Sequence, residues 1–191
     1  MAWGSNLLIN QSAETNDTTG WVITPIGTVV ATENVTASTR YIPFPDSRDK
    51  WISNEHTLSL FGPSGDYCFR FDPTAQMEQI LYASDVGSQP VNFQLIGKYK
   101  LEQPQYLWDV NVLGMITLTI YYTDGTSDYF IIPCVKGVTH IDRNLSNWWI
   151  IVYNICAVTP NKTLSYVKVT AKTINCSQIV NIDYIELRKE V

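Results

Sequence analysis

The stretch Ile116–Pro133, ITLTIYYTDGTSDYFIIP, decides the fold class of this 191-residue chain. Apolar residues alternate with threonine before the pair Asp124-Gly125, and an apolar, aromatic run follows it. An Asp-Gly pair between alternating apolar residues is a strong β-hairpin signal, and both loop residues of the two-residue turn take positive φ. The stretch therefore predicts two antiparallel strands joined by a two-residue loop.

The two-residue loop also predicts the register of the hairpin. The expected facing pairs are Tyr122–Ser127, Ile120–Tyr129 and Leu118–Ile131, which places one apolar set on one face. The opposite face then carries Thr117, Thr119, Tyr121, Asp128, Phe130 and Ile132. This second face is mixed, because it combines aromatic and polar side chains.

Other parts of the chain repeat the strand pattern. Strands are expected at 6–9, 21–26, 29–31, 57–61, 67–71 and 91–101, and within 147–158, 163–173 and 180–189. In 163–173, Tyr166, Lys168, Thr170 and Lys172 alternate with Val167, Val169 and Ala171, so one face is expected to be solvated. The pattern predicts an all-β, antiparallel β-sandwich that forms a single domain over residues 1–191. Residues 1–5 are expected to be disordered or the remnant of an added sequence.

Composition narrows the function classes. The chain has 13 Lys and Arg against 18 Asp and Glu, which gives a net charge of −5. No cluster of basic residues is present, so neither nucleic acid nor an anionic membrane surface is expected as a partner. No window approaches the roughly 18 apolar residues of a membrane helix, and no signal peptide is visible. We expect a secreted or cell- or spore-surface protein, with intracellular deposition as the alternative.

The four cysteines are Cys68, Cys134, Cys156 and Cys176. Their wide spacing contains no Cys-x-x-Cys pair, which argues against a zinc ribbon or a redox motif. Buried thiols that pack as small apolar groups are expected, and one or two disulfides are the alternative. Four cysteines allow three pairings, between which sequence does not choose.

Taken in order, several short motifs resemble the jelly-roll carbohydrate-binding modules attached to xylanases and cellulases. The motifs are NLLINQSAETNDTTGW from Asn6, HTLSLFG from His56, AQMEQILYAS from Ala75, VNFQLIGKYKLE from Val91 and NIDYIEL from Asn181. The resemblance implies a jelly roll that binds a polysaccharide or a cell-surface glycan without cleaving it. Residues Asp72–Ser84 fit a helix and a strand equally well by pattern, and the resemblance favours a strand.

The resemblance also implies a site for each ligand. A structural Ca²⁺ is expected to join both ends of the chain through Glu14 and Asp183, although the second acid that often follows in the family is replaced by Tyr184. The alternative is that both acids are ordinary surface carboxylates. The glycan is expected on the mixed hairpin face and on aromatic residues of flanking loops: Tyr41, Trp51, Trp108, Thr119, Tyr121, Asp128 and Phe130. Packing in the core is the alternative for the loop aromatics.

Catalysis is not expected. The chain has two histidines, His56 and His140, and neither Gly62–Gly65 nor the His140–Arg143 tetrapeptide matches a catalytic motif. A different class remains open. Low charge, exposed aromatic residues and four cysteines also suit a self-assembling structural protein, such as a spore-coat, sheath or parasporal crystal component, with a homo-oligomer or lattice as its partner.

Overall fold

A computed structural model covers the 191 residues of the chain. It describes residues 2–13, 15–24, 30–34, 67–71, 75–101, 112–135, 150–174 and 180–191. Within these ranges the elements are β1 (Trp3–Asn6), β2 (Val22–Thr24), β3 (Val30–Asn34), β4 (Tyr67–Phe71), β5 (Gln76–Tyr82), α2 (Ala83–Val86), β6 (Phe93–Leu101), β7 (Val112–Tyr122), β8 (Ser127–Val135), β9 (Ile150–Cys156), β10 (Leu164–Thr173) and β11 (Val180–Glu190). No helix in this part of the chain is long and apolar enough to cross a membrane.

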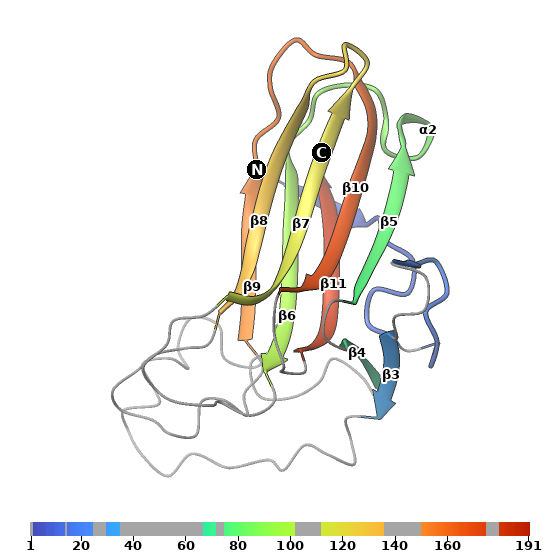
Figure 1. The fold of residues 1–191 in the computed structure, drawn as a ribbon. Coiled ribbons are helices and arrows are strands. Elements are labelled where there is room, and N and C mark those ends of the chain that lie inside the picture. The colour runs from blue at the N-terminus through green and yellow to red at the C-terminus, as the bar shows by residue number, and fades with distance from the viewer. Residues whose placement is uncertain are drawn as a thin grey trace.

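The strands form two antiparallel sheets that pack face to face (Figure 1). The front sheet has the order β2-β5-β10-β7-β8, and the back sheet has the order β3-β4-β11-β6-β9, with β1 paired to β11. Apart from β3–β4 and β7–β8, neighbouring strands are not consecutive in the chain, and every described pairing is antiparallel. The all-β jelly-roll sandwich predicted from the sequence is confirmed.

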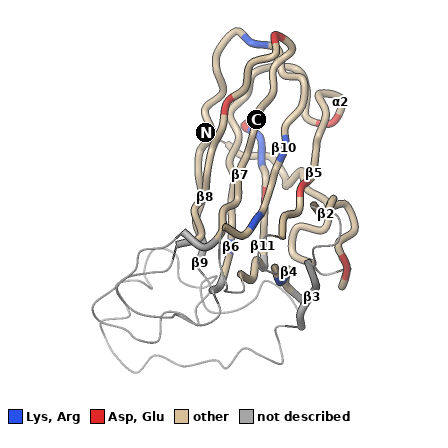
Figure 2. The backbone as a smooth tube through the Cα atoms, viewed as in Figure 1, with Lys and Arg blue, Asp and Glu red and all other residues tan. Residues whose placement is uncertain are grey.

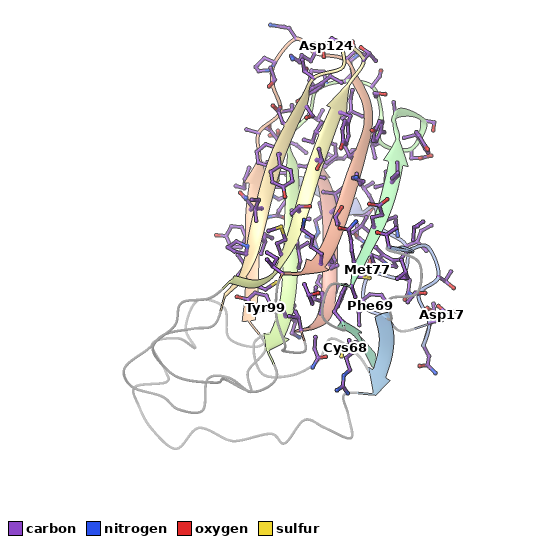
Figure 3. The ribbon with its side chains drawn as sticks, viewed as in Figure 1. Asp17, Cys68, Phe69, Met77, Tyr99 and Asp124 are labelled. Carbon is purple, nitrogen blue, oxygen red and sulfur yellow. The ribbon has the colours of Figure 1, made fainter. Side chains whose placement is uncertain are left out.

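Alternation along the strands builds the core. On β10, Val167, Val169 and Ala171 are fully buried, whereas the residues between them face away from the back sheet. The front sheet adds Met77, Ile116, Leu118 and Ile120, and the back sheet contributes Phe69, Phe93, Leu95, Tyr99, Ile182, Ile185 and Leu187. Phe69, Met77 and Tyr99 lie toward the end of the sandwich that is opposite Asp124 (Figure 3). Burying these side chains is the main favourable term in folding.

The cysteines contribute to the same core. Cys68, Cys134 and Cys156 are fully buried, and Cys134 and Cys156 are free thiols. Burial raises the pKa of the Cys156 thiol to about 12, so it stays protonated and behaves as a small apolar group. The expectation of buried thiols is therefore confirmed for this part of the chain, while Cys176 lies outside the described residues.

The predicted hairpin register is wrong by one residue. The structure pairs Tyr121 with Ser127, Thr119 with Tyr129 and Leu118 with Phe130. The loop has three residues, because Tyr122 N donates to Thr126 O (3.0 Å) and Gly125 N donates to Tyr122 O (3.1 Å). Only Gly125 takes a positive φ, of 83°, as in a turn followed by a glycine bulge. A shift by one residue moves side chains of one strand to the other face.

Most of the remaining strand predictions are confirmed, with changed ends, but the strand expected at 6–9 is wrong, because β1 ends at Asn6 and residues 7–9 are not in a strand. Gln76–Tyr82 is a strand, as the resemblance favoured, and the short helix α2 follows it. The segment 57–61 lies outside the described residues. Disorder was one of the two expectations for residues 1–5, and it is wrong for Trp3–Ser5, because Trp3 pairs with Glu190 and β1 extends the back sheet. The other expectation, an added sequence, stays a prediction.

The polar opening of the chain is held in place by direct hydrogen bonds. Leu7 N donates to Leu187 O (2.8 Å), Ile185 N donates to Gln11 O (2.9 Å), and Val191 N donates to Ala2 O (3.1 Å). The buried amide of Gln79 adds a second anchor, since it accepts from Ile9 N and donates to the Ile9 and Gly20 carbonyls. These bonds place residues 2–13 beside β11, so both ends of the chain belong to one structure.

Gly97, on β6 of the back sheet, packs against side chains of the front sheet and leaves no room for a Cβ. A Cβ at this position would lie 2.4 Å from Ile116 Cδ1 and 3.8 Å from Ile132 Cδ1. We predict that Gly97→Ala destabilises the fold by about 1–3 kcal/mol, because overpacking a dense core forces side chains out of position. Denaturant unfolding measures this change.

The matched variant removes the methyl group that the new Cβ meets. Ile116→Val alone should cost about 0.5–1.5 kcal/mol, but in the Gly97→Ala background it should restore stability. Additive losses in the double variant would contradict the close contact between Gly97 and Ile116.

Candidate functional site

The solvent-facing side of the front sheet, here called the front face, brings together side chains of five strands. Its described members are Val22, Thr24, Gln76, Glu78, Ile80, Tyr82, Met115, Thr117, Thr119, Tyr121, Ser127, Tyr129, Ile131, Pro133, Tyr166, Lys168, Thr170 and Lys172. Strand pairing orders them into rows that run across the sheet. Such a surface presents many side chains on one rigid support.

Three tyrosines form one of these rows. Tyr82 of β5 pairs with Tyr166 of β10, which pairs in turn with Tyr121 of β7. The rings of Tyr121 and Tyr166 stack at 4.3 Å between centroids and 18° between planes, and those of Tyr82 and Tyr166 lie 6.2 Å apart at 51°. Tyr82 is 58 % exposed, and no described residue bonds to any of the three hydroxyl groups. The tyrosine row therefore offers ring surface and unused hydroxyl groups to solvent.

Polar side chains adjoin the tyrosine row. Lys168, two residues from Tyr166 on β10, pairs with Glu78 of β5 at 3.6 Å, and both side chains are largely but not fully buried. The Gln76 amide donates to the same carboxylate oxygen, Glu78 Oε2, at 3.4 Å. Thr117, Thr119 and Thr170 lie close to the sheet and are at most 9 % exposed. Carboxylate, ammonium and amide groups are thus fixed beside aromatic rings.

The structure separates the residues predicted for the mixed hairpin face. Thr119 and Tyr121 lie on the front face, whereas Asp128 and Phe130 lie on the opposite side of the front sheet, which faces the core. The prediction that the four share one face is wrong. The cause is the three-residue loop, which shifts β8 by one position against β7. Tyr129 and Ile131 take the outward positions, with exposed fractions of 53 % and 40 %.

The structure does not describe the side chains of the other predicted site residues. Tyr41, Trp51 and Trp108 belong to segments that the structure does not describe, as does Glu14. Asp183 lies within β11, but its side chain is not described. Among the described residues, no group of three or more His, Cys, Asp or Glu side chains could hold a metal ion. The predicted Ca²⁺ ligands therefore stay a prediction.

Sequence reasoning missed Tyr82 and Tyr166 as site residues. Tyr166 stood in the alternating pattern of β10, on the face that was expected to be solvated. Tyr82 closes a segment whose pattern fitted a helix and a strand alike. Tyr82 and Tyr166 lie beside each other and beside Tyr121 because β5 and β7 flank β10 in the sheet. Pairing between strands that are distant in the chain leaves no local signal in the sequence.

Asp128 holds the loop after β9 against the hairpin instead of facing solvent. Its carboxylate accepts a hydrogen bond from the Tyr122 hydroxyl, one from Thr159 N (2.9 Å) and one from Thr159 Oγ1 (2.9 Å). Burial alone would raise the pKa of this carboxyl, but these hydrogen bonds outweigh it and lower the pKa. Burial and the bond to Asp128 raise the pKa of the Tyr122 phenol.

The hairpin tip is fixed by a second, exposed set of contacts. Asp124, labelled at the end of the sandwich in Figure 3, accepts from Thr126 N (2.9 Å) and Thr126 Oγ1 (2.6 Å). These bonds lower its pKa to about 2, and Lys162 lies 3.2 Å from its other oxygen. The turn that sets the hairpin register is thus braced on both sides.

Comparison with known proteins supports the fold. No protein-family model matches the chain, and no curated protein matches it. Solved structures do match. The structure of TmCBM61 in complex with beta-1,4-galactotriose aligns over 98 % of this chain and 100 % of its own, with a TM-score of 0.55 and 14 % identity. The CBM22-1 xylan-binding domain of Xyn10C from Paenibacillus barcinonensis aligns over 99 % and 97 %, with a TM-score of 0.53 and 14 % identity.

Part of an enzyme chain shares the same fold. The enzymatically active domain of tailspike protein 4 from bacteriophage CBA120 aligns over 97 % of this chain but 21 % of its own, with a TM-score of 0.57 and 13 % identity. At these identities the comparisons show the fold alone. The resemblance to jelly-roll carbohydrate-binding modules is confirmed at that level, and ligand and activity must be argued from the side chains.

The Asp128 contacts predict a stability difference that depends on pH. Asp128→Asn should lower the stability by about 1–3 kcal/mol at neutral pH, which is several degrees in melting temperature for a chain of this size. Because the folded-state pKa is lowered, this stabilisation is present above the ordinary value of 3.8 and is lost as the pH falls through the folded value. Melting curves of both proteins from pH 3 to pH 7 should therefore converge in acid.

Asp124→Asn is the comparison variant: Asp124 is fully exposed, so the contacts that brace the turn are weakened by solvent, and the loss of stability should be the smaller of the two. An equal loss in both variants, or a difference for Asp128→Asn that does not change with pH, would contradict the role given to Asp128.

Proposed function

We propose that this protein binds a glycan on the front face and does not cleave it. The observation that carries the proposal is the tyrosine row of Tyr82, Tyr166 and Tyr121, whose hydroxyl groups have no described partner, next to the Glu78–Lys168 pair. The fold shared with carbohydrate-binding modules supports it. Partner and location follow from the proposal: a polysaccharide or cell-surface glycan outside the cell.

The chemistry of the face suits a sugar. A pyranose ring has apolar CH faces and a rim of hydroxyl groups, so aromatic surface and hydrogen-bonding groups act on it together. Tyr82 supplies exposed ring surface, the three phenols supply donors and acceptors, and Glu78 and Lys168 can bond to hydroxyl groups. Such an open face supports modest affinity, with a Kd of ~10⁻⁵ to 10⁻³ M, or about −4 to −7 kcal/mol.

Replacing one ring of the row should weaken binding and leave the fold intact. We predict that Tyr82→Ala lowers the affinity for a retained polysaccharide by about 5- to 30-fold, the equivalent of 1–2 kcal/mol for a lost aromatic contact. Affinity electrophoresis against xylan, galactan, glucomannan and β-glucan measures this change. Reducing-sugar assays on the same polysaccharides should show no cleavage.

Tyr153→Ala is the control, because Tyr153 is equally exposed, at 55 %, but lies on β9 in the back sheet. It should bind as the wild type does. Equal losses in both variants would move the site away from the front face, and release of reducing ends would contradict a role in binding alone.

A structural, self-assembling role is the second candidate. Tyr129 and Ile131 on β8 and Tyr153 and Ile155 on β9 are exposed, and the two strands adjoin, since Asn154 Nδ2 donates to Ile131 O (3.3 Å). Exposed apolar side chains on edge strands favour contacts between copies. Elution as a large assembly on a sizing column, with retention by none of the polysaccharides, would favour this role over glycan binding.

Calcium belongs to the proposal as a structural ion. Carboxylates of Glu14 and Asp183 and nearby carbonyls are hard oxygen ligands of the kind that Ca²⁺ prefers. The bond from Ile185 N to Gln11 O supports the pairing, because it brings the segments before Glu14 and after Asp183 side by side. Bound Ca²⁺ would add a charged link between the two ends of the chain.

Removal of calcium tests this part separately. Because a ligand of the native state stabilises by RT ln(1 + [L]/Kd), a hundredfold excess over Kd should add about 2.7 kcal/mol. The melting temperature should rise by several degrees with CaCl₂ and fall with EDTA, and Glu14→Gln should abolish the difference. Identical melting in all conditions would exclude the site.

A further inference from the structure

The front face carries few charges, and they do not cancel. Glu78, Lys168 and Lys172 are its charged members among the described residues. Figure 2 shows the basic positions as two segments along β10 and an acidic position on β5. Glu78 and Lys168 neutralise each other at 3.6 Å. One positive charge, that of Lys172, is left on the face.

Lys172 has no counter-ion in the part of the chain that the structure describes. Its strand partners are Gln76 and Met115, neither of which is charged. The Gln76 amide is engaged with Thr24 (3.1 Å) and Glu78 (3.4 Å). The Lys172 side chain is half-buried, and no described residue accepts a hydrogen bond from its ammonium group. An ammonium group in this position favours an anion as its partner.

Lys172 and the tyrosine row share one strand and one face. Tyr166 and Lys172 are six residues apart on β10, which is about 20 Å at the rise of an extended strand. Lys168 and Thr170 lie between them on the same face. A ligand bound at the tyrosine row and extending along β10 for several sugar units would therefore reach the ammonium group.

The overall charge of the protein does not oppose this contact. The chain carries a net charge of −5, which alone would repel an anionic polymer. At physiological ionic strength, however, charges separated by more than about 8 Å are largely screened from each other. The local field at Lys172 is therefore set by the groups beside it.

We propose that the glycan bound by the front face is acidic, and that Lys172 binds its anionic group, a uronate carboxylate or a sulfate ester. This inference rests on the proposed function and adds the substrate class to it. Lys172 determines specificity: the tyrosine row holds the sugar rings, and Lys172 favours chains that carry an anionic group. Because the pair is solvated, binding to acidic chains weakens as the salt concentration rises.

The test compares polysaccharides that differ only in charge. Glucuronoxylan is compared with its carboxyl-reduced form, and a sulfated galactan with its desulfated form, by affinity electrophoresis at low and moderate salt. The wild type should bind the charged member of one pair about twofold to fivefold more tightly, which is the usual effect of one exposed ion pair. The pair that shows the preference identifies the anionic group.

Three variants assign the preference to Lys172. Lys172→Gln should bind both members of the pair equally, and Lys172→Arg, which keeps the charge, should retain the preference. Lys189→Gln makes the same change in net charge on β11 of the back sheet, where its ammonium group donates to Val86 O, and should behave as the wild type.

The outcomes separate this inference from the proposed function. Equal binding of charged and neutral forms by the wild type, or an unchanged preference in Lys172→Gln, overturns the role of Lys172 and leaves glycan binding in place. Retention of no polysaccharide, neutral or acidic, overturns both.

Discussion

The register of the β7–β8 hairpin decides which side chains of β8 face the solvent and which face the core. Gly125, at a φ of 83°, allows a loop of three residues, and Asp124 and Lys162 brace it. With this loop Leu118 and Phe130 face the core together, and Tyr121 points outward next to Tyr166. A two-residue loop would shift β8 by one position and exchange its two faces. The Asp128 contacts and the outward positions of Tyr129 and Ile131 both follow from this register.

Much of the fold could be predicted from local sequence. Alternation identified β10 and both of its faces, since Val167 and Lys168 must point in opposite directions on a regular strand. The loop length could not be read in the same way, because Asp-Gly fits a two-residue turn and a turn with a glycine bulge alike. The motifs that resemble carbohydrate-binding modules did give the correct strand for Gln76–Tyr82.

The candidate site was harder to predict than the fold. Tyr82, Tyr121 and Tyr166 are separated by 39 and 45 positions in the chain, and the strand order β5-β10-β7 alone makes them neighbours. Sheet order is set by packing over the whole domain, so no local pattern marks the row. Asp128 illustrates the converse: it looked like a surface carboxylate by pattern, but the register directs it to Tyr122 and Thr159.

The same sandwich supports different ligands in other proteins, so its side chains must explain what this chain binds. Here the back sheet and the core provide a rigid support. The tyrosine row, the Glu78–Lys168 pair and Lys172 lie one after another along the front face. In the proposed mode of binding, each group acts on a different feature of a sugar chain: ring faces, hydroxyl groups and charge. This division of roles follows from the alternation of inward and outward side chains along β10, which places Tyr166, Lys168 and Lys172 on the outward face.

A titration of the ¹⁵N-labelled protein with xylohexaose, galactotriose and a glucuronic-acid-substituted xylo-oligosaccharide, followed by amide chemical shifts, tests the central claim most directly. If the front face is the glycan site, one of these ligands shifts the amides of β5, β10 and β7 near Tyr82, Tyr166 and Tyr121, while those of β6 and β11 stay in place. Shifts that concentrate on the back sheet, or no shift with any of the three at millimolar concentration, would contradict it.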